Sequence, residues 1–244
     1  MNILVTGSNG FLGKNLVDFL KSYTKHNVYE FSKRSSINYL EEMIESLDIV
    51  FHFAGLNKAT DINDYEKVNV NLTLKICNLL KKNPNIVLFY ASSTQVFLNN
   101  PYGKSKKKGE KICLDLENKF HNKVYILRLP GIFGIGCKPN YNSVVGTFCF
   151  NSANNLELKI INPNKEIELV YIIDLCEQLS KLIASKKSRC FVDIENKNKI
   201  TISELARIIQ NFKDIPMGKR FIGINQDLEM KLYETYLSYR KINN

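Results

Sequence analysis

The feature that most constrains this chain is the glycine pattern near its N-terminus. The apolar run Ile3–Val5 leads into glycines spaced G-x-x-G-x-x-G, and a stretch with helical periodicity follows. In this context the first glycine permits a tight turn, the second lets the backbone approach a pyrophosphate, and the third lets the helix pack on the strand. Backbone amides without hydrogen-bond partners at the start of the helix can bind an anion. The segment therefore predicts a dinucleotide-binding loop, formed by Gly7, Asn9, Gly10, Phe11, Leu12 and Gly13.

The rest of the first half alternates short apolar runs with longer stretches of helical spacing. The predicted strands are Ile3–Val5, Val28–Phe31, Ile49–Phe53, Ile86–Tyr90 and Val124–Leu127, and the predicted helices are 11–24, 37–46, 64–82 and 102–120. Such alternation indicates an α/β fold, a doubly wound parallel sheet of the Rossmann type with helices on both faces. In these sheets, ligands bind at the carboxyl ends of the strands.

After about residue 130 the pattern is less regular. A loop rich in Gly, Pro and Asn, 131–142, is followed by predicted helices at 143–154, 173–185, 201–212 and 226–239, and by predicted strands near 158–161 and 190–194. Thr201 and Glu204 form a capping-box pattern. We find no repeat and no low-complexity linker, so we expect one domain over 1–244. Residues 1–130 would mainly bind the cofactor and carry catalysis, and 131–244 would mainly form a small substrate-binding lobe.

Composition excludes several classes of protein. The net charge is +10, but only six of the 34 basic residues are Arg and the lysines are dispersed, so a small polyanionic substrate is favoured over nucleic acid. The six cysteines lack metal-ligand spacing, which predicts free thiols in a reducing cytoplasm and no metal site. The N-terminus does not read as a signal peptide, and no apolar stretch approaches the roughly 18–20 residues that cross a bilayer.

The end of the second predicted strand bears on the choice of dinucleotide. An acidic residue there would accept hydrogen bonds from a ribose 2′-hydroxyl, as in NAD-preferring sites. Here the strand is followed by Ser32, Lys33 and Arg34. Two cations favour the 2′-phosphate of NADP, although an ordinary pair of solvated charges has the same sequence. We predict NADP and assign these three residues to its binding.

Two Y-x-x-x-K pairs occur, and their context separates them. Tyr29 and Lys33 fall at a strand, whereas Tyr102 and Lys106 open a helix and share one face of it. That helix follows the predicted strand that leads to Ser93. A Ser–Tyr–Lys set at the carboxyl edge of a sheet suits carbonyl reduction: the Tyr hydroxyl gives a proton, the Lys ammonium lowers the Tyr pKa and holds a ribose, and the Ser hydroxyl steadies the oxygen.

These motifs together resemble the extended short-chain dehydrogenases/reductases, which include nucleotide-sugar epimerases, dehydratases and 4-ketoreductases. The resemblance covers residues 1 to about 175. Beyond the glycine loop and the Ser–Tyr–Lys set, it is carried by His52-Phe-Ala54-Gly55, Asn69, Arg128-Leu-Pro130-Gly-Ile-Phe-Gly134 and Asp174. It implies that Ala54, Gly55, Pro130, Tyr102 and Lys106 contribute to the cofactor site. It also implies a homodimer paired through helices 64–82 and 102–120.

A narrower resemblance is carried by Cys137-Lys-Pro-Asn-Tyr-Asn-Ser-Val-Val-Gly-Thr-Phe148, by the short spacing from Ser93 to Tyr102, and by the segment 232–239. It is similar to capsular-polysaccharide reductases that make UDP-2-acetamido-2,6-dideoxy-L-hexoses. This implies NADPH-dependent reduction of the C4 ketone of a UDP-2-acetamido-2,6-dideoxy-hexos-4-ulose, giving a product of L-talo or L-rhamno configuration.

The chain departs from that pattern in three places. It lacks the C-terminal cupin domain that epimerises C3 in those enzymes, so it is either a fragment or reduces its ketone without that domain. A separate 3-epimerase acting upstream is one partner that the second alternative allows. Gly131 replaces a frequent Asn. Ile167 and Glu168 stand near the place of an Arg that many members carry. Diphosphate contacts must then come from elsewhere, and we assign them to Lys138, Asn142 and Ser143.

Two other functions remain open from the sequence. One is a nucleotide-sugar epimerase that retains its NAD(P). The related dehydratases carry an Asp-Glu pair after the Ser/Thr, and Thr94-Gln95 stands there instead, which argues against elimination of water. The other is a non-catalytic dinucleotide sensor on the same fold. The intact set of Ser93, Tyr102 and Lys106 argues against a sensor. For His52, the sequence favours a packed strand residue over a catalytic base.

Overall fold

The computed structural model describes residues 1–185, 190–215 and 226–240. The chain divides into two compact units, which are described separately. The first consists of Met1–Leu129 and Cys176–Ile194, and the second of Pro130–Leu175 and Glu195–Asn244. The first segment of the first unit ends at Leu129, and the segment Cys176–Ile194 returns to that unit. Among the described residues, no helix is both long and apolar enough to cross a membrane.

The first unit is built on a six-stranded sheet in which every neighbouring pair is parallel, in the order β2-β1-β3-β4-β5-β8. The strands are β1 Asn2–Thr6, β2 Asn27–Phe31, β3 Ile49–His52, β4 Val87–Ser93, β5 Val124–Leu129 and β8 Phe191–Val192. This confirms the predicted α/β fold. The chain order reverses between β1 and β3, and the carboxyl ends of strands at such a switch point are where doubly wound sheets bind ligands.

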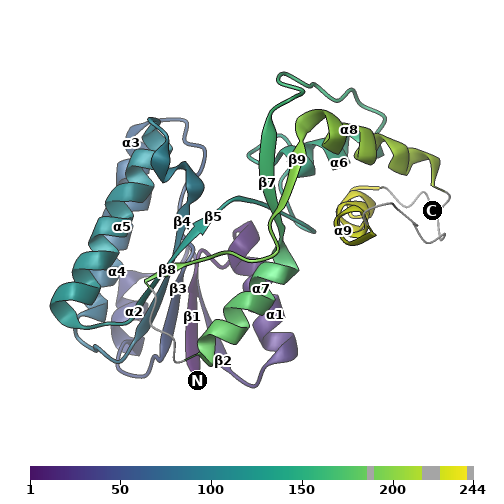
Figure 1. The fold of residues 1–244 in the computed structure, drawn as a ribbon. Helices are drawn as coiled ribbons and strands as arrows, with labels where there is room; N and C mark the ends of the chain where they lie inside the picture. The colour runs from purple at the N-terminus through teal and green to yellow at the C-terminus, as the bar shows by residue number, and fades with distance from the viewer. Residues whose placement is uncertain (186–189, 216–225, 241–244) are drawn as a thin grey trace. The chain divides into compact units, whose positions relative to one another are not determined.

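Helices cover both faces of this sheet (Figure 1). One face carries α2 Ile37–Met43, α4 Leu72–Leu80 and α5 Pro101–Phe120, and the other carries α1 Phe11–Tyr23 and α7 Ile172–Ile183, of which the part from Cys176 belongs to this unit. The core under α4 and α5 includes Leu4, Val50, Leu88 and Ile126, all 0% exposed. On the opposite side of the strands, Phe89 stacks between Phe51 and Tyr125 at 4.5 and 4.6 Å. Alternation along each strand produces these two apolar faces.

The helix predicted over 64–82 is interrupted. The structure has a short α3 Asn63–Tyr65, then a π-helical segment, η1 Glu66–Asn71, and then α4. Apolar spacing cannot distinguish a π-helical turn from an α-helical one over so few residues. Single π-helical turns within helices are frequent at functional sites, and Asn69, which the sequence singles out, lies in this one.

The second unit contains a three-stranded sheet in the order β6-β7-β9, formed by β6 Gly131–Phe133, β7 Glu166–Tyr171 and β9 Asn198–Thr201. Its helices are α6 Val144–Ala153, α8 Ile202–Asn211 and α9 Gln226–Leu237, and the first residues of α7 also belong to it. Thr201 caps α8 by accepting a hydrogen bond from the Glu204 amide at 3.2 Å, as the capping box predicts.

The strand predicted near 158–161 is wrong. Those residues lie outside the sheet, Leu158 alone is buried, and Ile161 is 88% exposed. Pro163 follows closely and lacks the amide that a sheet ladder needs. The actual strand, β7, begins at Glu166, where alternating Glu and apolar residues suit a sheet that is half exposed.

Candidate active site

The glycine loop has the close contacts that the sequence predicts. Gly7 has a φ of +69°, and a Cβ there would lie 2.7 Å from the backbone nitrogen of Ala54. A Cβ on Gly13 would clash with the carbonyl of Gly7, which brings α1 directly against the loop. The Gly10 amide donates to the same carbonyl at 2.8 Å. Side chains at positions 7 and 13 would therefore force β1, α1 and the end of β3 apart.

The start of α1 has the properties of an anion site. Its N-cap, Gly10, supplies no side-chain hydrogen bond to the helix. Within the described part of the chain, the buried hydroxyl of Ser8 has no hydrogen-bond partner. Free amides and the positive end of the helix dipole attract a phosphate group, so the loop fits the pyrophosphate of a dinucleotide.

The predicted NADP residues lie beside this loop. The Gly7 amide donates to the carbonyl of Phe31 at 2.8 Å, and Ser32 follows at once. The turn is held by the Ser35 amide, which donates to the Ser32 carbonyl at 3.0 Å. Lys33 and Arg34 are both exposed in it. The structure thus brings two cations close to the glycine loop within the first unit.

The segment after β3 is clamped by Asn69. Its side-chain amide donates to the carbonyl of Leu56 at 2.8 Å, and its oxygen accepts from the Leu56 amide at 2.7 Å. The same amide group reaches Ser105 on α5 at 2.9 Å. A Cβ on Gly55 would lie 3.2 Å from both Asn69 Oδ1 and Lys106 Nζ, so glycine leaves room for these two polar groups.

Ser93 and Tyr102 come together although they lie on different elements. Ser93 ends β4 and caps the turn η2 Thr94–Phe97, while Tyr102 stands in the first turn of α5. Asn100 caps α5 by accepting from the Gly103 amide at 2.7 Å. Burial raises the pKa of the Tyr102 hydroxyl, and a hydrogen bond with the Ser93 side chain lowers it in part. Tyr102 therefore stays protonated at neutral pH, as a proton donor must.

Lys106 is buried, with 5% of its surface exposed. Its Nζ donates to the Ala91 carbonyl at 2.6 Å and lies 5.0 Å from the centre of the Tyr90 ring. Burial lowers the pKa of Lys106 to about 8, and nearby Cys113 and Glu110 offset this partly. The sequence predicts that Lys106 lowers the pKa of Tyr102. In the structure its ammonium points to Ala91, and the pKa of Tyr102 is raised.

His52 is a packed strand residue, as predicted. It is fully buried, and its ring nitrogens lie 2.8 Å from Thr6 Oγ1 and 2.9 Å from Thr73 Oγ1. Burial, aided by the charge of Lys106, lowers the pKa of His52 to about 3. The ring is neutral at physiological pH.

One element of the site was missed from the sequence. Glu110, one turn beyond Lys106, is buried and accepts from Ser92 at 2.6 Å. It also receives two hydrogen bonds from Arg128 at the end of β5, at 2.9 and 2.7 Å. The guanidinium lies 4.8 Å from the Phe97 ring and 4.2 Å from the Phe191 ring. The available signal was the spacing Lys106-x-x-x-Glu110 together with Arg128 in the motif after β5.

The second unit holds the three residues assigned to the substrate. Ser143 caps α6 by accepting from the Gly146 amide at 3.1 Å. Lys138 and Asn142 are exposed, and Lys138 Nζ lies 5.3 Å from the Tyr141 ring. The two segments of the narrower resemblance meet, because the Tyr239 hydroxyl donates to the Cys137 carbonyl. Pro130 joins β5 to β6 and belongs by its contacts to this unit.

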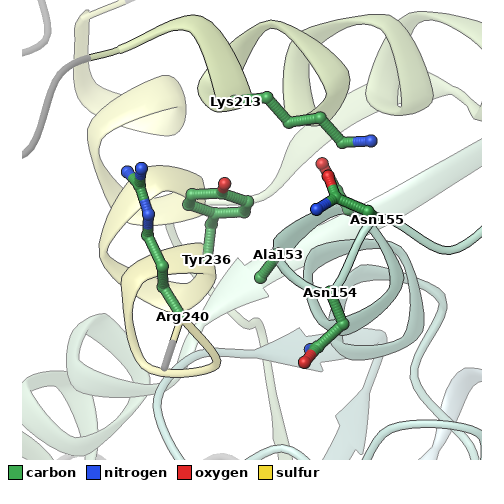
Figure 2. Close-up of a pocket in the computed structure, with 7 residues that line it drawn as sticks. Ala153, Asn154, Asn155, Lys213, Tyr236 and Arg240 are labelled. Carbon is green, nitrogen blue, oxygen red and sulfur yellow. The ribbon is translucent and has the colours of Figure 1, made fainter. Parts of the chain in front are cut away.

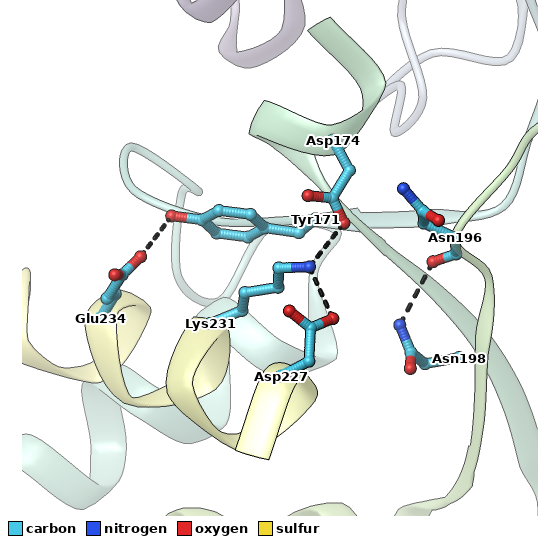
Figure 3. Close-up of polar contacts among 7 residues, drawn as sticks. All are labelled: Tyr171, Asp174, Asn196, Asn198, Asp227, Lys231 and Glu234. Atoms are coloured by element: carbon cyan, nitrogen blue, oxygen red, sulfur yellow. Dashed lines mark hydrogen bonds and ion pairs between the residues drawn. The ribbon is translucent and has the colours of Figure 1, made fainter. Parts of the chain in front are cut away.

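Asp174 lies in the first turn of α7, directly after β7, where the resemblance places it. Lys231 of α9 donates to Asp174 at 2.8 Å and to Asp227 at 2.7 Å, and the Tyr171 hydroxyl donates to Glu234 at 2.8 Å (Figure 3). These contacts attach α9 to the end of β7. We assign them to the stability of the second unit.

The second unit also has a hollow of about 350 Å³ between α6 and α9 (Figure 2). It is lined by Ser152, Ala153, Asn154, Asn155, Lys213, Tyr236 and Arg240. No residue predicted for catalysis, cofactor or substrate lines it, so it is not the candidate active site.

The sequence profile described as "NAD dependent epimerase/dehydratase family" matches residues 3–192. The chain belongs to this family. Over 241 residues it is 36% identical to the UDP-2-acetamido-2,6-beta-L-arabino-hexul-4-ose reductase of Pseudomonas aeruginosa strain PA103, with 98% of this chain and 65% of that protein covered. The chain therefore spans slightly less than two thirds of the length of this relative.

Solved structures agree with this family assignment. The capsular polysaccharide assembling protein CapF of Staphylococcus aureus superimposes with a TM-score of 0.86 at 33% identity, covering 99% of this chain and 66% of CapF. A UDP-glucuronic acid 4-epimerase of Bacillus cereus, solved with UDP-glucuronic acid and NAD, gives a TM-score of 0.84 at 18% identity, covering 98% of this chain and 99% of that one. The second likeness supports the fold alone.

Proposed function

We propose that this protein is a nucleotide-sugar 4-ketoreductase that uses NADPH to reduce the C4 ketone of a UDP-2-acetamido-2,6-dideoxy-hexos-4-ulose. The observation that carries the proposal is the grouping of Ser93, Tyr102 and Lys106 at the carboxyl edge of β4, in a unit that also has a dinucleotide loop. The reductase name of the Pseudomonas relative and the capsular-polysaccharide name of CapF support the substrate class.

The residues present fit a nicotinamide dinucleotide. Gly7 and Gly13 let β1, α1 and the end of β3 pack closely, a Cβ on Gly10 would meet only the Gly7 carbonyl, and the α1 N-terminus supplies amides for a pyrophosphate. Asn9, Phe11 and Leu12 complete the loop. When bound, the reduced nicotinamide supplies the hydride. Ala54, Gly55 and Pro130 complete our assignment of the cofactor site.

In the proposed reaction the carbonyl carbon gains a hydride and its oxygen gains the proton of the Tyr102 hydroxyl, so the ketone becomes an alcohol. The raised pKa keeps this proton in place until negative charge develops on the substrate oxygen. Ser93 donates to the same oxygen and stabilises that charge. Lys106, held by Ala91, supplies a positive charge next to the reacting groups.

We propose NADPH rather than NADH because Lys33 and Arg34 are exposed in the turn beside the glycine loop, where a 2′-phosphate would be neutralised. Ser32 adds a hydroxyl in the same turn. Since no carboxylate stands at this point, the usual partner of the NAD ribose is missing.

We propose that the second unit binds the UDP-sugar through Lys138, Asn142 and Ser143. One lysine and two neutral polar side chains can hold a diphosphate. The contact between Tyr239 and Cys137 fixes one end of this loop, and Ser143 fixes the other at α6.

We also propose a homodimer paired through η1–α4 and α5, a cytoplasmic location, and a separate 3-epimerase acting upstream. All six cysteines are unpaired, which supports a reducing compartment.

Deuterium transfer tests the reaction itself. The protein would be incubated with NADPH deuterated at the nicotinamide C4 and with the UDP-linked 4-keto-6-deoxy N-acetyl sugar made in situ. We expect one equivalent of NADPH to be oxidised and deuterium to appear at C4 of the product. An epimerase that retains its cofactor would give a changed sugar with no net NADPH oxidation and no deuterium, and that result would contradict the reductase proposal.

A further inference from the structure

A continuous chain of hydrogen bonds runs beneath the switch point of the sheet, between β1, β3 and the π-helical segment. Its side chains are at most 1% exposed, so water does not compete for their polar groups. In order, they are Thr6, His52, Thr73 and Asn69. The Ala54 amide joins the chain at Thr6, at 3.1 Å.

The direction of each hydrogen bond follows from counting protons. Thr73 Oγ1 gives its one proton to the Asn69 carbonyl at 2.9 Å, because a carbonyl can only accept. Toward His52, Thr73 must therefore accept, so His52 Nε2 carries the ring proton. Nδ1 is then bare and accepts from Thr6 Oγ1. Thr6 in turn accepts from the Ala54 amide. One neutral tautomer satisfies every group.

The two ends of this chain reach the two halves of the active site. Thr6 is the residue before Gly7, so one end holds the strand that carries the glycine loop. At the other end Asn69 donates to Ser105, and Ser105 donates to the Tyr102 carbonyl at 2.7 Å. His52 thus connects the cofactor loop with the first turn of α5.

We infer that His52 is a positioning residue, which, through Thr6 and Thr73, sets the glycine loop in register with the helix that carries Tyr102 and Lys106. This inference rests on the proposed function for its effect on rate. His52 acts as a fixed link with one donor and one acceptor, and takes no part in proton transfer. A displacement of about 1 Å between reacting groups can lower a rate by about 100-fold, which is the scale of the expected effect.

The ionisable groups facing His52 keep it in this role. Lys106 places a positive charge nearby, and the Tyr90 ring lies 5.7 Å from the imidazole. A second ring proton, on Nδ1, would set the ring and the Thr6 hydroxyl against each other as two donors and would leave the Thr6 hydroxyl proton without its acceptor. The chain therefore stays in one arrangement across the working pH range.

The tautomer is measured by ¹H–¹⁵N NMR of the imidazole side chains, with His52 assigned by comparison with the His52→Gln variant. We expect a pyrrole-like Nε2 and a pyridine-like Nδ1 that do not change between about pH 5 and 9. A proton on Nδ1, or titration of His52 within that range, would overturn the inference. This measurement needs no enzyme activity.

The positioning effect is measured in Thr73→Val, which removes one hydroxyl at nearly constant volume. It is measured in His52→Gln as well, so that the test does not depend on the folding of a single variant. Leu80→Ala is the control, a core change in the same unit away from the chain. We expect Thr73→Val to lower kcat about 10- to 100-fold, with a larger primary isotope effect from deuterated NADPH and a KM for NADPH within about threefold of wild type. Equal kcat in Thr73→Val and wild type would overturn the inference.

If the wild-type protein reduced no keto sugar, the proposed function would fail, and positioning would then be tested through Lys106. Gly55 brings Asn69 and Lys106 together, so a displaced Asn69 changes the surroundings of Nζ. We expect the NMR titration midpoint of Lys106 to move in Thr73→Val and to stay in Leu80→Ala. An unmoved midpoint in Thr73→Val would overturn the inference independently of any turnover.

Discussion

Gly13 of α1 lies directly against Gly7 of the loop after β1, so that a Cβ on Gly13 would clash with the Gly7 carbonyl. Gly10 differs, because a Cβ there would lie 3.1 Å from the same oxygen and its φ of −82° suits any residue. The two glycines are therefore needed for different reasons. Gly13 allows α1 to pack against the loop, and we assign Gly10 to the proposed pyrophosphate site.

This difference predicts opposite results for two alanine variants. Gly13→Ala should lower the free energy of unfolding by about 2 kcal/mol, the scale of an overpacked core, and lower Tm by about 4–8 °C. Gly10→Ala should keep a Tm near wild type but bind NADPH about tenfold more weakly, because a methyl group there would add bulk at the proposed pyrophosphate site. Thermal unfolding and NADPH fluorescence titration measure the two effects. Equal behaviour of the two variants would contradict the structure of the loop.

Cofactor choice should depend on the turn after β2. Arg34→Ala should raise the KM for NADPH about tenfold and leave the KM for NADH nearly unchanged, because only NADPH carries the 2′-phosphate. Lys25→Ala, which removes an exposed positive charge elsewhere in the unit, is the matched control. Steady-state kinetics with both cofactors provide the comparison. If Arg34→Ala weakened both cofactors alike, the 2′-phosphate assignment would be wrong.

The activity should begin to fall at a lower alkaline pH than it would if Lys106 had the pKa of an ordinary lysine. Burial lowers the pKa of Lys106 from 10.5 to about 8, so its ammonium is lost as pH rises through about 8. We expect kcat/KM to decline above that pH. Since the folded pKa lies below the unfolded value, the buried charge costs stability below pH 8, and this cost is relieved between about pH 8 and 10.5.

Substitution separates this lysine from its neighbours. Lys106→Met should lower kcat/KM at least about 100-fold, whereas Lys107→Met, an exposed position on the same helix, should not. A wild-type pH profile that stays flat beyond about pH 9 would count against a catalytic role for the Lys106 ammonium.

Removing one partner of the Glu110–Arg128 pair should cost far more stability than removing one partner of an exposed pair. Arg128→Leu leaves the Glu110 carboxylate, 5% exposed, without its bidentate partner, which costs about 3 kcal/mol and about 6–12 °C in Tm. The Lys108–Glu66 pair is at least half exposed on both sides, so Lys108→Leu should shift Tm by about 2 °C or less. Comparable Tm shifts in the two variants would show that burial of Glu110 does not increase the stability lost when its partner is removed.

Much of the fold was predictable because the signals were local. The first five strands contain short apolar runs, and the glycine loop and the α8 capping box are contiguous motifs. Tyr102 and Lys106 could be separated from Tyr29 and Lys33 because helix and strand present side chains differently. Strand β7 and the π-helical turn were missed, since a half-exposed strand and a single wide turn leave weak periodicity.

The remaining parts of the site depend on tertiary contacts between distant segments. No spacing rule joins Glu110 to Arg128, or His52 to Thr6 and Thr73, because each partner comes from a different element. Likewise, the sequence could not show that the Lys106 ammonium points to the Ala91 carbonyl. These relations arise only when the strands are placed side by side.

The most direct test of the central claim follows NADPH absorbance in the presence of the UDP-linked 4-keto-6-deoxy N-acetyl sugar, for the wild type, Tyr102→Phe and Tyr29→Phe. The two variants each remove one hydroxyl from a Y-x-x-x-K pair. We predict that the wild type and Tyr29→Phe oxidise NADPH, while Tyr102→Phe is slower by at least about 100-fold. Absence of NADPH oxidation by the wild type, or full activity of Tyr102→Phe, would contradict the account.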